Sequence, residues 1–243
     1  MTERTVLSIS GDDRVSFLQG LITNDVEKAA DGIIYAALLT PQGKYISDFF
    51  VIGQSDRLLI DVATSHAPTL AQRLMMYRLR AAVVIEETGL IVSRGTGPAP
   101  SGALSDPRHS QMGWRLYGDA NVSDDTDWDA LRVEHLIPET GIELMADSYI
   151  LEAGFEQLNG VDFKKGCYVG QEIIARMKHK TTLRKGLSKV SITGSAPIGT
   201  PIANAENKAV GTLFTQANGH AIAYLRFDRA TGTLSAGAAE ITV

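Results

Sequence analysis

A single cysteine, Cys167, among 243 residues limits what can hold this chain together. One thiol cannot close an intrachain disulfide, form a Cys-x-x-Cys redox pair or supply the thiolates of a zinc or iron–sulfur site. The five histidines show no spacing typical of a metal site either. The fold must therefore rest on a hydrophobic core, and we expect no dedicated metal site within one chain.

The composition is that of a globular protein, with 44% hydrophobic and 21% charged residues, and the length allows one large or two modest domains. Residues 1–5 lack a signal-peptide pattern, and no apolar run approaches the roughly 20 residues that span a bilayer. We expect a cytoplasmic protein with no membrane partner. The net charge of −5 argues against a nucleic-acid partner.

Hydrophobic periodicity and turn residues predict an antiparallel α+β unit in the first ninety residues. Pro41 and Gly43 stand where a β-turn needs them, so residues 33–39 and 45–52 should form a hairpin. Pro68 should open a helix with Leu70 and Leu74 on its buried face. The other elements expected here are a helix at 13–22 and strands at 58–62, 82–86 and 90–93.

Further along, residues 94–108 are rich in Gly, Pro, Ala and Ser, which favours a linker or surface excursion, and residues 119–129 are acidic and solvated. A helix is expected at 128–137. Short apolar strands separated by Gly and Asn-Gly turns then predict a small β-barrel. The fold class is thus α+β with antiparallel sheets and helices. Its three expected parts are an N-terminal part at 1–95, a middle part at 96–184 and the C-terminal β-barrel at 185–243.

The thiol lies in Lys164-Lys165-Gly166-Cys167-Tyr168-Val169-Gly170-Gln171-Glu172, where small and cationic residues surround it. Neighbouring cations and a helix N-terminus lower the pKa of a thiol from its usual value of about 8.5, and a helix is predicted over 171–177. Two glycines flank the thiol, as they do where a backbone approaches a ligand. A reactive thiol and a small buried hydrophobe both fit the sequence at this point.

Basic residues follow directly, because no acidic residue occurs between Glu172 and Glu206. This run is either a solvated rim or a funnel that attracts anions to a site. Its members are Arg176, Lys178, Lys180, Arg184, Lys185 and Lys189.

Taken together, these segments resemble the YgfZ-type folate-binding proteins, relatives of the glycine-cleavage T-protein (aminomethyltransferase) family. The most specific match is the segment Gly160 to Arg176, which contains Lys-Gly-Cys-Tyr-Val-Gly-Gln-Glu. The other matching segments are Phe17–Gly20, Thr23–Val26, Thr40–Lys44, Asp106–Arg108, Gly113–Arg115, Arg132 with Glu134, Pro138–Gly141, Val210–Thr212 and Ala221–Leu225.

The resemblance implies a T-protein-like fold and a protein that binds tetrahydrofolate, or a one-carbon derivative of it, and assists iron–sulfur cluster assembly or repair. Its implied partners are reduced folate and iron–sulfur client or assembly proteins. Cys167 would be essential, with Lys165 holding the thiolate and Tyr168 shaping the loop. The implied folate-binding residues are Glu152 for the pterin, Arg184 for the glutamate tail, and Asn24, Gln171 and Glu172.

Two enzyme alternatives remain at this stage. The first is a folate-dependent one-carbon transferase of the aminomethyl type. Ser47 stands where the aminomethyltransferases carry a catalytically important aspartate, and Asp48 should point to the opposite face of its strand, so glycine-cleavage activity is not expected. The second is a thiol hydrolase, which would need a histidine beside Cys167, and the nearest in sequence is His179.

Overall fold

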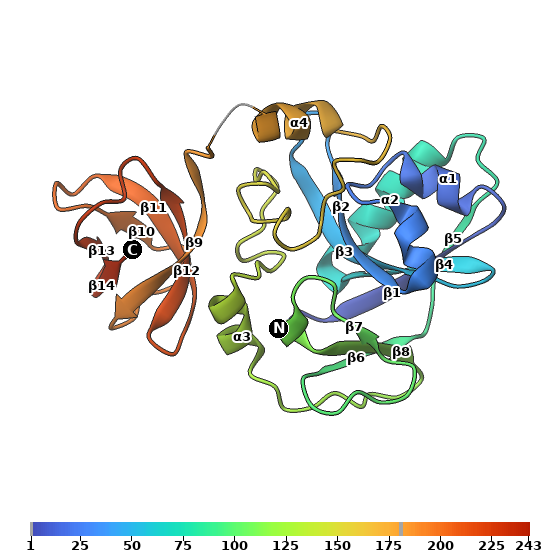
Figure 1. Ribbon diagram of the computed structural model, residues 1–243, viewed down its shortest axis with the longest axis horizontal. Coiled ribbons are helices and arrows are strands. Elements are labelled where there is room, and N and C mark those ends of the chain that lie inside the picture. Colours follow the sequence, from blue (N-terminus) through green and yellow to red (C-terminus); the bar gives the residue numbers. More distant parts are fainter. Residues whose placement is uncertain (1, 180–181) are drawn as a thin grey trace. The chain divides into compact units, whose positions relative to one another are not determined.

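The computed structural model describes residues 2–179 and 182–243 (Figure 1). The chain forms two compact units. The sheet unit comprises residues 2–126 and 155–175, and the barrel unit comprises residues 127–154 and 176–243. Each unit is thus built from two separate stretches of sequence.

A five-stranded antiparallel sheet in the order β2-β3-β4-β1-β5 forms the centre of the sheet unit. The predicted hairpin is present, with Tyr35 opposite Phe50 in its register. Strand β1 lies between β4 and β5, and it was not predicted from the sequence. The strands are β1 (Arg4–Ser10), β2 (Ile33–Leu39), β3 (Tyr45–Gly53), β4 (Arg57–Ala63) and β5 (Val84–Glu87).

Two helices, α1 (Arg14–Gln19) and α2 (Ala67–Arg78), contribute to the apolar core of this unit. Leu18, Leu70 and Leu74 are fully buried in it. Side chains alternate along β3, so Phe49 points into this core while Phe50 points to the opposite face of the sheet. Proline in the first turn of α2 confirms the predicted helix start.

A second, three-stranded sheet in the order β6-β8-β7 completes the sheet unit. Its strands are β6 (Ile91–Gly95), β7 (Leu104–Ser105) and β8 (Trp114–Gly118). The prediction of a linker or surface excursion over residues 94–108 is wrong for Asp106 and Arg108, which are buried. Glycine and proline do form turns in this stretch. Asp106 and Arg108 can nevertheless be buried, because they form an ion pair with each other.

The barrel unit contains the predicted C-terminal β-barrel, closed in the order β10-β11-β12-β9-β14-β13. Its apolar interior is a separate core. Helix α3 (Trp128–His135) packs mainly against β11. The strands are β9 (Lys185–Thr193), β10 (Pro201–Ala203), β11 (Ala209–Ala217), β12 (His220–Arg226), β13 (Leu234–Ala236) and β14 (Ala239–Thr242).

Helix α4 (Gln171–His179) begins in the sheet unit, and the boundary between the units falls within it. The division into parts at 95/96 and 184/185 stays a prediction. Within the described ranges, none of the helices is long and apolar enough to cross a membrane.

Candidate functional site

The Cys167 loop, residues 162–170, leads from the end of an irregular segment into α4. Cys167 itself is exposed. An exposed thiol does not fit the interpretation of Cys167 as a small buried hydrophobe. The side chains that flank Gly166 and Cys167 are buried instead. They belong to Lys165 and Tyr168.

Lys165 fastens the loop to the segment that follows α1. Its Nζ donates hydrogen bonds to the carbonyl oxygens of Gln19 (2.8 Å), Ile22 (2.7 Å) and Asn24 (2.8 Å). Burial lowers the pKa of Lys165 to about 8, against the opposing effect of nearby carboxylates. All of its N–H donors are occupied in this arrangement, so it can act on the thiol only through its charge.

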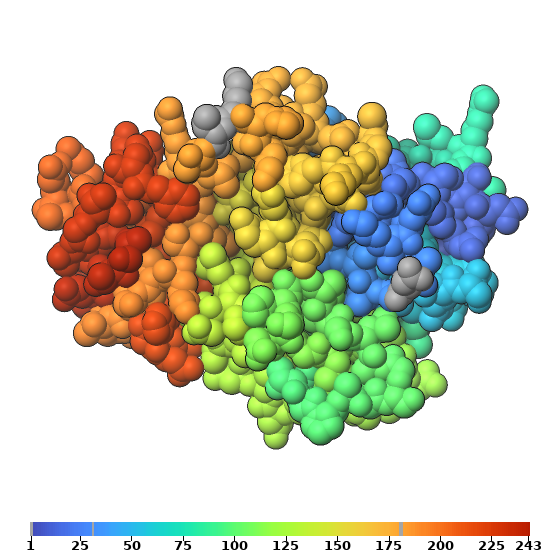
Figure 2. Space-filling model, in the orientation of Figure 1, coloured from blue at the N-terminus to red at the C-terminus, as the bar shows by residue number. Residues whose placement is uncertain are grey.

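Further hydrogen bonds attach the irregular segment before the loop to the same stretch of chain. The Thr23 hydroxyl donates to the carbonyl of Gly160 (2.6 Å), and the Asn24 side-chain amide donates to the carbonyls of Tyr35 and Asn159 (2.8 Å each). Figure 2 shows this segment, in yellow to orange, lying against the blue N-terminal part. Asn24 is therefore a bracing residue here, and its contact with folate stays a prediction.

Charge also anchors the start of the loop. Asp162 forms an ion pair with Lys28 (2.7 Å) and accepts a hydrogen bond from the backbone N–H of Lys164 (2.7 Å). Burial raises the pKa of this carboxyl, but Lys28 and the backbone donors outweigh burial, and its pKa is lowered. The aspartate thus remains ionised and holds the loop at neutral pH.

Two glycines let the Thr40–Lys44 turn of the hairpin pack against the start of α4. Gly170 has a φ of +84°, and a Cβ added there would collide with the carbonyl oxygen of Thr40. Gly43 has a φ of +71°, and a Cβ there would collide with the side chain of Ile173. Glycine is required at both positions for conformation and for space. Three segments that the sequence resemblance identified are therefore adjacent in space.

The remaining predicted residues are Tyr168, in the second half of the loop, and two residues at the start of α4. The Lys165 ammonium lies 5.2 Å from the centre of the Tyr168 ring. Burial raises the pKa of the Tyr168 hydroxyl to about 12, so this hydroxyl stays protonated. Gln171 and Glu172 form the first turn of α4, where a carboxylate interacts favourably with the helix dipole. Cys167 precedes that turn by four residues.

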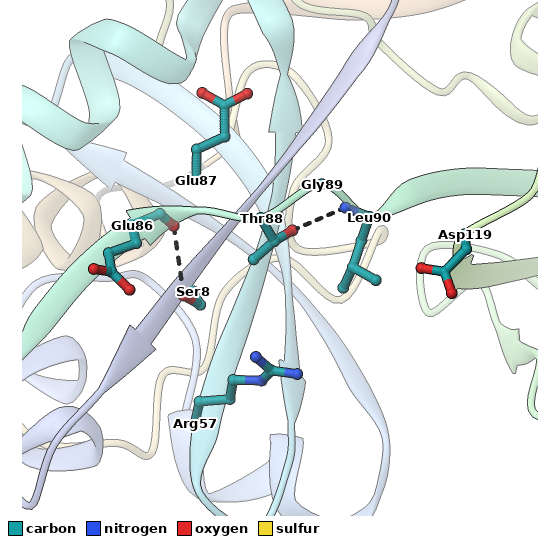
Figure 3. A pocket seen from close by; sticks show the side chains of 8 residues that line it. All are labelled: Ser8, Arg57, Glu86, Glu87, Thr88, Gly89, Leu90 and Asp119. Atoms are coloured by element: carbon teal, nitrogen blue, oxygen red, sulfur yellow. Dashed lines mark hydrogen bonds between the residues drawn. The ribbon is translucent and has the colours of Figure 1, made fainter.

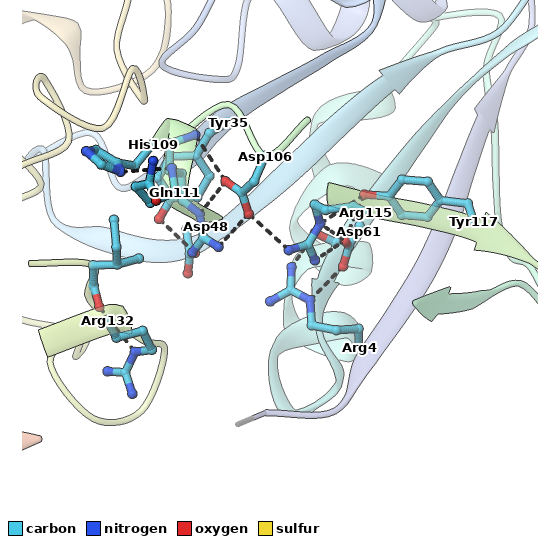
Figure 4. Close-up of polar contacts among 12 residues, drawn as sticks. Arg4, Tyr35, Asp48, Asp61, Asp106, His109, Gln111, Arg115, Tyr117 and Arg132 are labelled. Atoms are coloured by element: carbon cyan, nitrogen blue, oxygen red, sulfur yellow. Dashed lines mark hydrogen bonds and ion pairs between the residues drawn. The ribbon is translucent and has the colours of Figure 1, made fainter. Parts of the chain in front are cut away.

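A buried ionic network, which the sequence did not predict, lies between the two sheets of the sheet unit (Figure 4). Asp61 on β4 accepts hydrogen bonds from Arg4 (2.6 Å) and Arg115 (2.5 Å). Asp106 is paired with Arg108 (2.7 Å), and Arg115 lies 3.9 Å from the centre of the Phe50 ring. Burial raises the pKa of Asp61, but the arginines outweigh it and lower the pKa to about 2. Such a network fixes how the two sheets pack.

Asp48 lies on the same face of β3 as Phe50. Its carboxylate accepts hydrogen bonds from the hydroxyls of Tyr35 (2.9 Å) and Tyr45 (2.7 Å). Both oxygens are occupied and the side chain is buried. Asp48 therefore has a structural role here. Ser47, at the position where the aminomethyltransferases carry an aspartate, has no carboxylate.

Glu152 and Arg184 belong to the barrel unit. Glu152 is mostly buried, and its Oε2 accepts a hydrogen bond from the Tyr224 hydroxyl on β12 (2.7 Å), with Lys185 nearby at 3.9 Å. Arg184 is exposed, just before β9. Among the predicted basic residues, Lys180 lies outside the described residues. The predicted folate contacts are thus divided between the two units.

No group of three or more His, Cys, Asp or Glu side chains in the described part of the chain could hold a metal ion. Gln171 and His179 are at opposite ends of α4, about 12 Å apart along its axis. The geometry of α4 therefore does not favour a Cys167–His179 pair of the hydrolase type.

One pocket of about 390 Å³ lies on the sheet unit (Figure 3). Its charged lining is mainly acidic, with Glu86, Glu87 and Asp119 against Arg57. An anionic ligand such as folate would be repelled by these carboxylates. None of the predicted site residues lines this pocket, so it does not serve as the folate site predicted from the sequence.

Sequence comparisons with known proteins give three findings. Residues 184–243 match the model of the CAF17 C-terminal β-barrel domain. The chain is 29% identical to the human mitochondrial iron–sulfur cluster assembly factor IBA57 over 98% of this chain and 79% of that protein. It is 30% identical to the Mycosarcoma maydis homologue over 80% of this chain, but it spans only 57% of that relative's length.

Among solved structures, the aminomethyltransferase T of the glycine cleavage system from Bartonella henselae has a similar fold. The TM-score is 0.76, and the match covers 98% of this chain and 81% of that chain. Sequence identity is 12%, so this match concerns the fold alone. The predicted α+β fold with a C-terminal barrel is confirmed.

Proposed function

We propose that the chain is a member of the IBA57/YgfZ family and acts as an iron–sulfur cluster assembly factor whose working group is the Cys167 thiol. The observation that carries this proposal is the exposed thiol in a loop that two distant stretches of the chain, residues 19–28 and the Thr40–Lys44 turn, hold in place. An exposed cysteine without a function would not require a loop held by so many contacts.

The chemistry follows from what one thiol can do. A cluster is the cargo of this protein, and its irons need several thiolate ligands, of which this chain provides one. A client or assembly protein must supply the others. Cys167 loses its proton when it binds iron, because only the thiolate is a ligand. The bracing of the loop lowers the entropy that is lost when the thiol binds a partner's cluster.

Reduced folate is the second part of the proposal. The barrel unit offers groups of the right chemistry: a mostly buried carboxylate for the N–H edge of a pterin and an exposed arginine for the tail carboxylates. These are Glu152, oriented by the Tyr224 hydroxyl, and Arg184. The likeness of fold to an aminomethyltransferase is consistent with folate binding.

Aminomethyl transfer is the weaker candidate. Such transfer needs a carboxylate free to face a developing positive charge. The carboxylate of Asp48 is buried and accepts two tyrosine hydroxyls, and Ser47 has no charge. Incubation with 5,10-methylenetetrahydrofolate and candidate amines should therefore give no turnover.

The deciding experiment compares rescue by the natural chain and by Cys167→Ser in cells that lack this gene. The activities of iron–sulfur enzymes are measured at matched protein levels, with Lys164→Ser as a control for an exposed neighbour. We expect the natural chain and the control to restore activity and Cys167→Ser to fail. Equal rescue by Cys167→Ser would contradict the role of the thiol.

Folate binding is tested separately by calorimetric titration with tetrahydrofolate. Glu152→Gln should weaken binding roughly tenfold or more, as expected when a charged hydrogen-bond partner is lost. Glu240→Gln, at an exposed position on β14, is the matched control and should bind normally. If Glu152→Gln binds as tightly as the control, the pterin contact lies elsewhere.

A further inference from the structure

The end of α2 exposes large apolar side chains to solvent. Met75, Met76 and Leu79 have exposed fractions of 47%, 61% and 87%, whereas Leu70 and Leu74 on the other side of the helix are fully buried. Met75 and Met76 lie in the last turn of α2, and Leu79 directly follows its last residue, so the three are grouped at the end of the helix and are called the apolar strip here. Large apolar side chains grouped on a surface mark interaction sites more often than single ones do.

The backbone at Leu79 is strained. Its φ of +42° and ψ of −102° lie in a region that a bulky residue rarely adopts. The side chain on this strained backbone is 87% exposed, more than any other large hydrophobic side chain in the described part of the chain. The strain therefore holds an apolar group out in water, and strained positions of this kind gather at functional surfaces.

Arginines flank the strip along the chain. Arg73, Arg78 and Arg80 are all exposed, and none has an ion pair among the described residues. The chain as a whole carries a net charge of −5, yet no acidic residue occurs between Asp61 and Glu86. The strip is thus an apolar surface with a cationic border on an otherwise acidic chain.

We propose that this α2 surface, formed by Arg73, Met75, Met76, Arg78, Leu79 and Arg80, docks an acidic amphipathic segment of a partner protein. The flexible methionines can adapt to such a segment, and the arginines can pair with its carboxylates. A second copy of the chain is a poorer occupant, since a two-fold contact would bring like arginines together. The surface lies on an element that carries none of the residues proposed to act on clusters or folate, so its test is independent of that function.

The test uses a fluorescein-labelled synthetic helix of about 18 residues, long enough to be helical, with leucines on one face and glutamates beside them. A peptide of shuffled sequence and the same composition is the control. Binding to the full chain is followed by fluorescence anisotropy at low and high salt. Arg73→Glu/Arg80→Glu is compared with Arg226→Glu/Arg229→Glu, which changes the charge equally at exposed arginines of the barrel unit.

We expect the amphipathic peptide, but not the shuffled one, to bind in a salt-sensitive manner. The Arg73→Glu/Arg80→Glu variant should bind at least tenfold more weakly, and the barrel variant should bind as the natural chain does. Leu79→Gly should also weaken binding while its unfolding temperature stays at or above that of the natural chain, because glycine relieves the strain.

Three results would overturn the proposal. The first is equal binding by both charge-reversed variants, or no binding of the amphipathic peptide. The second is self-association that Met76→Glu abolishes in sedimentation equilibrium, which would make the occupant a second copy. The third is binding to phosphatidylglycerol vesicles, lost in Arg73→Glu/Arg80→Glu, without peptide binding, which would make it a lipid surface.

Discussion

Replacing Lys165 with methionine tests whether this side chain holds the Cys167 loop in place. Methionine keeps much of the apolar stem but leaves the carbonyl oxygens of Gln19, Ile22 and Asn24 without their donor. A hydrogen bond from a charged donor contributes about 1.5–3 kcal/mol, so the three together contribute about 6 kcal/mol before the cost of burying the charge.

That cost follows from the pKa of Lys165. Burial lowers this pKa from 10.5 to about 8. At about 1.36 kcal/mol for each tenfold change in the acid dissociation constant, the unfavourable contribution is about 3.4 kcal/mol, and screening by the solvent around the loop reduces it to about 2 kcal/mol. Some water will reach the freed carbonyls. The free energy of unfolding should therefore fall by about 3 kcal/mol in Lys165→Met.

The assay is thermal and urea unfolding of the full chain followed by circular dichroism. Lys164→Met is the matched control, because it removes the same charge from an exposed neighbour. For a chain of this length we expect Lys165→Met to unfold about 6–12 °C lower than the natural chain, and the control to change little.

The rate of Cys167 alkylation by iodoacetamide, measured across pH, separates bracing from direct contact with the thiolate. Because the Lys165 N–H groups bond to carbonyls, the two lysine variants should shift the pH dependence of this rate by similar amounts. Unchanged stability of Lys165→Met, together with a shift seen only in that variant, would refute the bracing role.

Three further outcomes are expected. Asp61, with its pKa held at about 2 against an ordinary 3.8, contributes about 2 kcal/mol at neutral pH that is lost as pH falls from about 4 to 2, so urea midpoints should drop there in the natural chain and less in Asp61→Asn. Gly170→Ala should cost roughly 1–3 kcal/mol or more in urea unfolding, because of the positive φ and the Thr40 carbonyl, whereas Gly166→Ala, in open space, should cost less. Cys167→Ser should leave the unfolding temperature within about 2 °C of the natural chain, since the thiol is exposed, and a larger loss would indicate a structural role.

Local chemistry explains which elements the sequence predicted well. The hairpin of β2 and β3 depends on Pro41 and Gly43 at fixed turn positions and on strongly β-forming residues beside them, and its boundaries agree closely with the structure. The barrel strands are likewise short and separated by turn residues. Strand β1 was missed although turn residues follow it at 11–13, because no turn residues mark its start and its partners β4 and β5 lie far away in the sequence.

The motif around Cys167, with its glycines, lysines and helix start, was identifiable from the sequence, as was the fold class. Only the tertiary structure decided that the thiol is exposed and that Lys165 bonds to carbonyls, because those carbonyls belong to residues 141 to 146 positions earlier in the chain. The same holds for Asp61, Arg115 and Asp106, whose charges are tolerated in the interior only because distant strands bring them together. Sequence periodicity records local geometry, whereas the burial and pairing of a charge depend on residues far away in the chain.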